Sequence, residues 1–337
     1  MDFLNGKKIL YFSPLFFGYE QAIKSTLEHQ FGAQVDFYDD RPSNDIWTKI
    51  FIRLNLKSFV QRKIDAYYST IFHNITTIAY DYIFIVSPET LGFHELKQIK
   101  ALQPRATFIL YMWDSFQNKN SLNTLTLFDR VVTFDPNDAK IYNLIFHPLF
   151  YIEDYASATA NDLKLYDICC IITAHSDRYS VTQKVKEYAQ KLSLKMFTFL
   201  YLNSKLMYWG RRIFVRKYQY GSIDDFSFSP MSQNEIISII AQSKAVLDIN
   251  HPSQIGLTMR TFEVLGAQKK LITTNHNITS YDFYDENNIL VIDRENPILN
   301  SVFFNTPYHS LEPSIYASYS LHNWINFVFD THKNKGQ

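Results

Sequence analysis

Short apolar runs alternate with amphipathic segments through the first half of the chain. Strands are predicted at residues 8–13, 34–38, 80–87, 107–112 and 131–134, and helices at residues 19–30, 92–102 and 137–143. Consecutive parallel strands need a crossover long enough to hold a helix, so this alternation is typical of a parallel sheet. The pattern therefore predicts a doubly wound α/β domain over about residues 1–150.

The alternation resumes after a segment of small residues at 156–161, which we interpret as a linker. Strands are predicted at residues 167–173, 196–201, 270–274 and 289–292, and helices at residues 178–192, 232–243 and 314–331. A chain of 337 residues is longer than one core usually supports. We therefore predict two Rossmann-like domains, 1–152 and 153–312, followed by a C-terminal helical segment, 313–337.

The stretch 246–275 is predicted to fold as strand, loop, helix and strand. Ligands of open α/β sheets bind beyond the carboxyl ends of the strands, where the loop from Asn250 to Thr258 should lie. Arg260 and Glu263 follow this loop, three residues apart on one face of the predicted helix. One interpretation is a ligand site, and the alternative is an ordinary ion pair on the helix surface.

Composition and charge narrow the function classes. The net charge is zero, which gives no reason to expect nucleic acid as a partner. The two cysteines, Cys169 and Cys170, are adjacent on a predicted strand and should remain free thiols on opposite faces, as suits a reducing compartment. The N-terminus lacks the pattern of a signal peptide, and no apolar run is long enough to span a membrane. We therefore expect a cytoplasmic protein.

Two basic stretches, 47–64 and 205–220, contain no acidic residue. The first has apolar residues spaced for an amphipathic helix with one basic face. Such segments can lie on an anionic membrane, which would place the protein at the inner face of the plasma membrane as a peripheral protein. The alternative for 47–64 is an ordinary surface helix.

Residues 256–274, GLTMRTFEVLGAQKKLITT, resemble the arginine, phenylalanine and glutamate segment of glycosyltransferase group 1 and CgeB-like proteins. The sequences YMWDS, FDRVVTFDPNDA and ITAHSDRY are similar to those of bacterial proteins for capsule or lipopolysaccharide synthesis. The resemblance implies a GT-B fold, in which the two domains face a cleft and the C-terminal helix crosses back. It also implies an N-terminal acceptor domain and a C-terminal donor domain for a nucleotide-sugar.

The resemblance also suggests roles for individual residues. Glu263 would hold hydroxyls of the donor, and a carboxylate can accept hydrogen bonds from two neighbouring hydroxyls. The other candidate donor-binding residues are Arg178, His251, Gly256, Thr258 and Arg260. Arg178 and Arg260 would face the pyrophosphate near helix N-termini, which favour anions. The helix that begins near Arg178 should be capped by Ser176 or Asp177.

Asp114 and His175 are the candidate catalytic residues. Asp114 ends a predicted strand of the first domain and could deprotonate an acceptor hydroxyl. Its alternative role is to cap Ser115 or Asn118. His175, in the loop after residue 173, could contact phosphate or sugar, whereas His251 could instead only shape the turn before Pro252.

The sequence lacks an Asp-x-Asp triplet and any cluster with zinc spacing, so we expect no metal and no cofactor beyond the nucleotide-sugar substrate. The resemblance implies transfer of a sugar to a glycan or lipid-linked acceptor of a surface polysaccharide. Two alternatives remain open, a nucleotide-sugar epimerase and a non-catalytic partner with the same fold. The second is kept because Ile255, separated from Glu263 by seven intervening residues, stands where better-known relatives carry a first glutamate.

Overall fold

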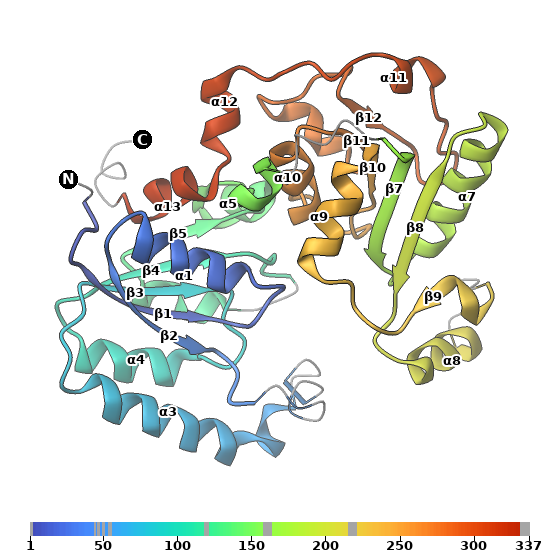
Figure 1. The fold of residues 1–337 in the computed structure, drawn as a ribbon. Helices are drawn as coiled ribbons and strands as arrows, with labels where there is room; N and C mark the ends of the chain where they lie inside the picture. Colours follow the sequence, from blue (N-terminus) through green and yellow to red (C-terminus); the bar gives the residue numbers. More distant parts are fainter. Residues whose placement is uncertain are drawn as a thin grey trace. The chain divides into compact units, whose positions relative to one another are not determined.

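The computed structural model describes residues 3–43, 45, 48, 51–52, 56–117, 121–157, 164–214 and 221–330. The chain divides into two compact units, Met1–Pro148 with Leu321–Gln337 and Leu149–Ser320 (Figure 1). Of the predicted linker, residues 156 and 157 end a helix, and residues 158–161 lie outside the described part of the chain.

The first unit is a parallel sheet with helices on both faces. Its strands are β1 (Lys8–Ser13), β2 (Gln34–Asp39), β3 (Tyr82–Val86), β4 (Thr107–Met112), β5 (Arg130–Thr133) and β6 (Ile145–Phe146). Its helices are α1 (Tyr19–His29), α3 (Gln61–Ile75), α4 (Phe93–Leu102), α5 (Pro136–Tyr142) and α13 (Leu321–Phe329), with short 3₁₀ helices at Lys57–Phe59 and Leu122–Leu127. Within the described residues the strand order is β2-β1-β3-β4-β5-β6, so the chain changes direction across the sheet between β1 and β3.

Alternation of apolar side chains along the strands fills both faces of this sheet. Leu10, Ile83 and Leu110 pack into the core beneath α3 and α4. On the other face, Trp324 of α13 packs edge-on against Tyr111 and Phe84, with ring centroids 4.6 and 6.2 Å apart. Strands buried on both faces are what a parallel sheet requires.

The second unit repeats this architecture. Its strands are β7 (Tyr166–Thr173), β8 (Met196–Tyr201), β9 (Phe226–Ser227), β10 (Ser243–Asp248), β11 (Lys270–Thr273) and β12 (Ile289–Val291). Its helices are α6 (Glu153–Ser157), α7 (Arg178–Lys191), α8 (Lys205–Phe214), α9 (Gln233–Ala241), α10 (Met259–Gly266), α11 (Ser301–Asn305) and α12 (Pro313–Ser318). In the part that is described, the order β12-β11-β10-β7-β8-β9 is parallel throughout. The predicted α/β fold of two doubly wound sheets is confirmed.

Two local predictions for the second unit are also confirmed, the start of a helix at residue 232 and the free thiols. Ser232 and Glu235 form a capping box at the start of α9. Cys169 and Cys170 are buried free thiols, and Cys170 packs in the core with Val181 and Val185 of α7.

The predicted single helix over residues 314–331 is wrong, because the chain breaks between α12 and α13. The main-chain N–H of Tyr151 donates to the carbonyl of Tyr319 at 2.8 Å, and Tyr151 and Ser320 form a β-bridge. Because the carbonyl of Tyr319 accepts from Tyr151, it does not accept from a main-chain N–H of a following helical turn. The chain therefore turns between α12 and α13. Residues 313–320 therefore belong to the second unit and residues from Leu321 to the first.

The predicted continuous helix over residues 47–64 is also wrong where the structure describes it. A 3₁₀ turn at Lys57–Phe59 interrupts the chain, and α3 begins only at Gln61. The buried face of α3 is formed by Ile64, Tyr68, Ile71 and Ile75. The apolar residues that follow a helical period therefore lie after residue 60. Among the described residues, no helix is long and apolar enough to cross a membrane.

Candidate functional site

The carboxyl ends of β7 and β10 form the natural ligand-binding position of the second sheet. After β7 the chain adds β8 and β9 on one side, and then returns to place β10 on the other side of β7. The loops that leave β7 and β10 therefore diverge at this point, and ligands of open α/β sheets bind in such a crevice. These loops contain His175 and His251, whose ring centroids lie 5.9 Å apart.

Asp248 at the end of β10 organises the start of α10. Its Oδ2 accepts hydrogen bonds from the hydroxyls of Thr258 at 2.6 Å and Thr261 at 3.0 Å. The Thr258 side chain in turn accepts from the main-chain N–H of Thr261, so Thr258 caps the helix. The N-terminus of α10 is thus fixed at the carboxyl edge of the sheet, with its dipole favouring an anion.

The loops after β7, β10 and β12 are joined by Arg294, a residue that the sequence analysis missed. Its Nη1 donates to both carboxylate oxygens of Asp177 at 3.0 and 2.9 Å. Its Nη2 donates to the carbonyl and the side-chain oxygen of Asn250 at 2.6 and 2.5 Å. The available signal was an arginine two positions after the predicted strand 289–292, at the edge of the sheet where loops converge.

The predicted side-chain cap of α7 by Ser176 or Asp177 is wrong. Asp177 occupies the N-cap position without a side-chain cap hydrogen bond, because Arg294 binds its carboxylate. Ser176 donates its hydroxyl to the carbonyl of His175 at 2.7 Å and has a positive φ of 52°. Such a backbone conformation costs free energy in a residue other than glycine, and it occurs preferentially at functional sites.

Arg178 begins α7 at the same edge and is only partly exposed. Its Nη1 donates to the carbonyl of Thr173 at 3.4 Å, and its buried Nε has no hydrogen-bond partner among the described residues. Burial lowers the pKa of this guanidinium, while the nearby carboxylate of Asp248 opposes the shift. A cation with an unused donor is destabilised by burial, so an anionic ligand would stabilise it.

Arg260 and Glu263 pair within α10, with Nη1 and Oε2 2.5 Å apart. The two residues pair along the helix as in the alternative interpretation, but their side chains are only 15% and 8% exposed, so the pair is largely buried. Arg260 also approaches the carbonyl of Ile171 in β7, at 3.4 Å from Nη2. Removing one member of such a pair is destabilising, because the other charge is left without its partner in a poorly solvated position.

The remaining predicted residues occupy loops at the carboxyl edges of the sheets. His175 is partly exposed, and its Nδ1 lies 3.3 Å from Ser176 Oγ. His251 is exposed, and its Nδ1 lies 2.8 Å from the hydroxyl of Ser253. The carbonyl of Gly256 accepts from the side chains of Gln254 and Asn275 at 3.0 and 3.3 Å. Asp114 follows β4 in the first unit and is partly exposed.

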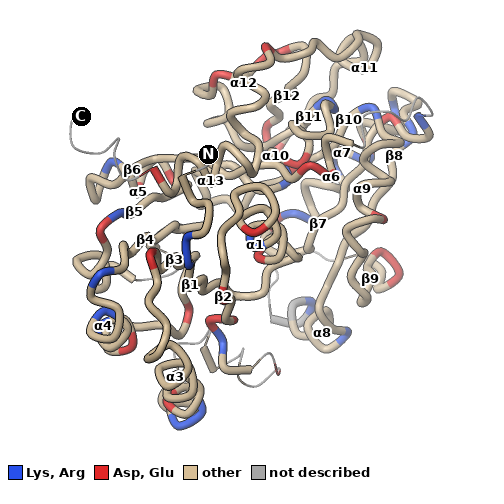
Figure 2. The backbone as a smooth tube through the Cα atoms, turned by 60° about the vertical axis from the view of Figure 1, so that its left-hand side comes forward, with Lys and Arg blue, Asp and Glu red and all other residues tan. Residues whose placement is uncertain are grey.

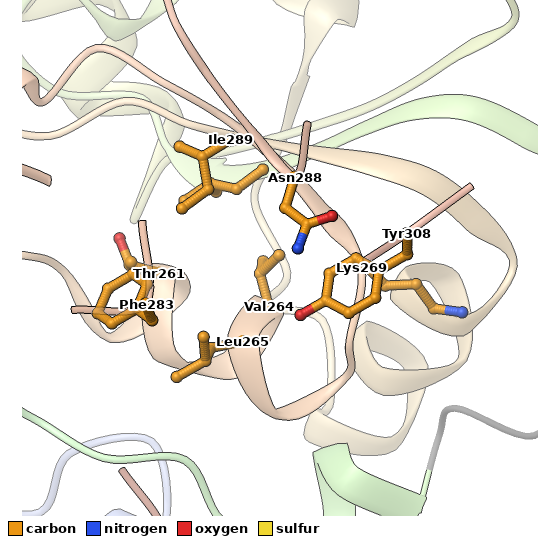
Figure 3. A pocket seen from close by; sticks show the side chains of 9 residues that line it. Thr261, Val264, Leu265, Lys269, Phe283, Asn288, Ile289 and Tyr308 are labelled. Atoms are coloured by element: carbon orange, nitrogen blue, oxygen red, sulfur yellow. The ribbon is translucent and has the colours of Figure 1, made fainter. Parts of the chain in front are cut away.

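A small hollow lies against α10 (Figure 3). Its lining is mostly apolar and consists of Thr261, Val264, Leu265, Lys269, Leu271, Phe283, Asn288, Ile289 and Tyr308. Lys269 and Asn288 directly precede β11 and β12, so the hollow lies towards the amino ends of these strands. It is therefore separate from the crevice at the carboxyl ends.

Solved structures of low sequence identity share this fold over nearly the whole chain. An α,α-trehalose-phosphate synthase (UDP-forming) from Burkholderia vietnamiensis is 8% identical, with a TM-score of 0.60 and 97% and 98% of the two chains covered. A UDP-GlcNAc 2-epimerase from Methanocaldococcus jannaschii, in complex with UDP-GlcNAc and UDP, is 10% identical, with a TM-score of 0.55 and coverage of 95% and 98%.

The lipopolysaccharide outer core galactosyltransferase WaaB is 9% identical, with a TM-score of 0.51 and coverage of 96% and 99%. No family model matches the chain, and a search of curated proteins finds no match. The structural likeness establishes the fold as two Rossmann-like domains of the GT-B type.

Proposed function

We propose that this protein transfers a sugar from a nucleotide-sugar donor, without a metal ion, to a precursor of a bacterial surface glycan such as capsule or lipopolysaccharide. One observation carries the proposal. The switch point of the second sheet brings together Arg178, whose Nε has no hydrogen-bond partner among the described residues, and the fixed N-terminus of α10, which holds Glu263. Cations and helix N-termini suit a diphosphate, and a carboxylate suits the hydroxyls of a ribose or sugar.

The reaction forms a bond between an acceptor oxygen and the anomeric carbon, and breaks the bond from that carbon to the diphosphate. Negative charge develops on the leaving diphosphate, and Arg178 is our candidate to stabilise it, with Arg260 as the second cation. His175 and His251, on the two diverging loops, are candidates to contact the phosphate or the donor sugar. Asp114 is our candidate for the base that removes the proton of the acceptor hydroxyl.

The similar structures support this assignment because several of them are of proteins that form UDP or are complexes with UDP or a UDP-sugar. One is a complex with UDP-GlcNAc and UDP, and another, HepE from Anabaena, contains UDP and glucose. The lipopolysaccharide galactosyltransferase favours a surface glycan as the product. Fold likeness alone does not carry substrates from one protein to another, so the residues of the site carry the argument.

A calorimetric panel of UDP, GDP, dTDP and CMP, without added metal, tests the proposal. We expect one nucleotide to bind clearly more tightly than the others, with no change of affinity when a metal chelator is present. Binding of none of the four would contradict the donor site and favour a non-catalytic partner. Incubation of the matching nucleotide-sugar alone separates transfer from epimerisation, because only an epimerase converts it to an isomer without an acceptor.

We further propose that α8 contacts the anionic surface of the membrane that carries a lipid-linked acceptor. Leu206 and Trp209, one turn apart, are 82% and 51% exposed. Lys205 and Arg212 lie on the same helix, which contains no acidic residue (Figure 2). Tyr208 is buried and donates its hydroxyl to the carbonyl of Gly221 at 2.8 Å, which fastens the helix to the domain. Interfacial helices combine these features.

Replacing both Leu206 and Trp209 by serine is expected to weaken binding to phosphatidylglycerol vesicles by at least about tenfold, because each apolar side chain contributes on the order of 1.5 kcal/mol when buried. Vesicle sedimentation measures the effect. Val302→Ser is the matched control, since Val302 is a 60% exposed apolar residue on helix α11 of the same unit. Equal vesicle binding by the double variant and the wild type would show that α8 does not contact the membrane.

A further inference from the structure

The loop after β1 exposes three consecutive apolar side chains. Leu15, Phe16 and Phe17 have 43%, 43% and 68% of their surface exposed. Single exposed apolar residues are common on protein surfaces, but a contiguous run of large ones marks an interaction site. None of these residues entered the proposed donor site, which lies in the other unit.

The loop is held in a defined conformation. The N–H of Phe16 donates to the Glu20 carboxylate at 2.9 Å. The Phe16 ring packs edge-on against Phe17, at 4.8 Å between centroids, and against Trp113, at 5.9 Å. Phe17 has a φ of 53°, which is unfavourable for a bulky side chain. The loop therefore keeps an aromatic ring in solvent at a conformational cost.

The position of this loop in the fold indicates a ligand. It leaves β1 where the first sheet changes direction between β1 and β3, which is the ligand-binding position of such sheets. Ser87, directly after β3, also has a positive φ, and its Oγ accepts from the N–H of Trp113 at 2.6 Å. The loops after β1, β3 and β4 are thus linked, and Asp114 follows Trp113 in the last of them.

The charge of this region argues for an uncharged occupant. Residues 14–18 and 113–117 contain no lysine or arginine, and the acidic residues present are Asp114 and, next to the first segment, Glu20. The loop after β3 adds Glu89, whose charge is balanced by the buried Arg41. An anionic lipid surface or a phosphorylated sugar would find no cation in these two segments. A neutral pyranose ring has an apolar face of C–H groups that packs on aromatic rings, and its hydroxyls hydrogen-bond to a carboxylate.

We infer that Phe16, Phe17 and Trp113 form an aromatic platform that binds an uncharged sugar ring of the acceptor beside Asp114. The inference rests on the proposed function and specifies the acceptor end as a neutral hexose or N-acetylhexosamine. The platform lies within the first unit, so its test does not depend on the donor site.

Saturation-transfer NMR of the full-length protein with methyl glycosides of glucose, galactose and N-acetylglucosamine tests the platform. We expect at least one glycoside to receive saturation mainly on the C–H groups of one ring face. The variant Phe17→Asn should weaken this binding by roughly tenfold through loss of the ring. Asparagine tolerates positive φ, so the loop should keep its conformation, and Phe17→Tyr should restore binding.

The control variant is Ile141→Ser, which removes a 61% exposed apolar side chain from α5 of the same unit. It should leave glycoside binding unchanged. Nucleotide affinity should be the same in Phe17→Asn and wild type, so failure of the platform is distinguishable from failure of the donor site. The inference is overturned if no glycoside binds, if glucose 6-phosphate competes as well as the neutral glycosides, or if Phe17→Asn alters only vesicle binding or oligomeric state.

Discussion

Replacing Glu263 by alanine is expected to lower the affinity for the preferred nucleotide by about 100-fold. The carboxylate would accept two hydrogen bonds from neighbouring hydroxyls, and bonds to charged groups contribute on the order of 1.5 kcal/mol each. Isothermal calorimetry with the nucleotide identified by the panel measures the change. Glu263→Gln, which keeps the volume but lacks the charge, should give an intermediate loss.

Glu263 also balances the charge of Arg260, at 2.5 Å, so its removal is expected to destabilise the second unit. Two comparisons separate binding from stability. Glu235→Ala removes a capping-box residue of α9 in the same unit, and should lower stability without changing nucleotide affinity. The double variant Arg260→Gln with Glu263→Gln removes both charges and should regain stability but not binding. Wild-type affinity in a folded Glu263→Ala protein would assign Glu263 to structure alone.

Replacing Gly266 by valine is expected to destabilise the second unit by about 3 kcal/mol, the upper end of typical overpacking costs. A Cβ at Gly266 would lie 2.7 Å from both Cβ and Cγ of Tyr151. Tyr151 cannot easily move away, because its N–H is bonded to Tyr319 and its ring stacks on Tyr316 at 4.8 Å. Tyr316 in turn donates its hydroxyl to the carbonyl of Gly266 at 2.8 Å.

Thermal unfolding measures this effect, and about 3 kcal/mol should lower the midpoint of the second unit by roughly 6–12 °C. Gly210→Val is the matched control, since Gly210 is also within a helix but a Cβ there would have no atom within 4 Å among the contacts that the structure describes. It should change the midpoint little. If both variants unfold at the wild-type temperature, the close contact between Tyr151 and α10 does not contribute to stability.

Local signals in the sequence were sufficient to predict most of the helices and strands and part of the candidate site. The alternation of apolar runs with helical periods predicted two parallel sheets, because burial on both faces requires it. Thr258 and Ser232 were found as helix starts because an N-cap depends on residues only three positions away. The same pattern placed the loops with His175 and His251 at the carboxyl edge, where the structure has them.

Predictions failed where a residue distant in the sequence competed for the same group. Asp177 has the chemistry of a cap, but Arg294 binds its carboxylate across 117 positions in the chain. Residues 314–331 have an unbroken helical pattern, yet the carbonyl of Tyr319 accepts a hydrogen bond from the main-chain N–H of Tyr151, and the helix is interrupted there. In neither case does the local sequence contain the competing partner.

The sequence alone thus determined the fold class, the starts of α9 and α10, and the loops in which the candidate residues lie, because these depend on the periodicity of burial and on short-range hydrogen bonds. Only the tertiary structure decided that Arg260 and Glu263 are a buried pair, that Arg294 joins three loops, and that Phe17 holds an exposed ring at positive φ. Burial, long-range ion pairs and backbone strain depend on which segments the fold brings together, and no local pattern specifies them.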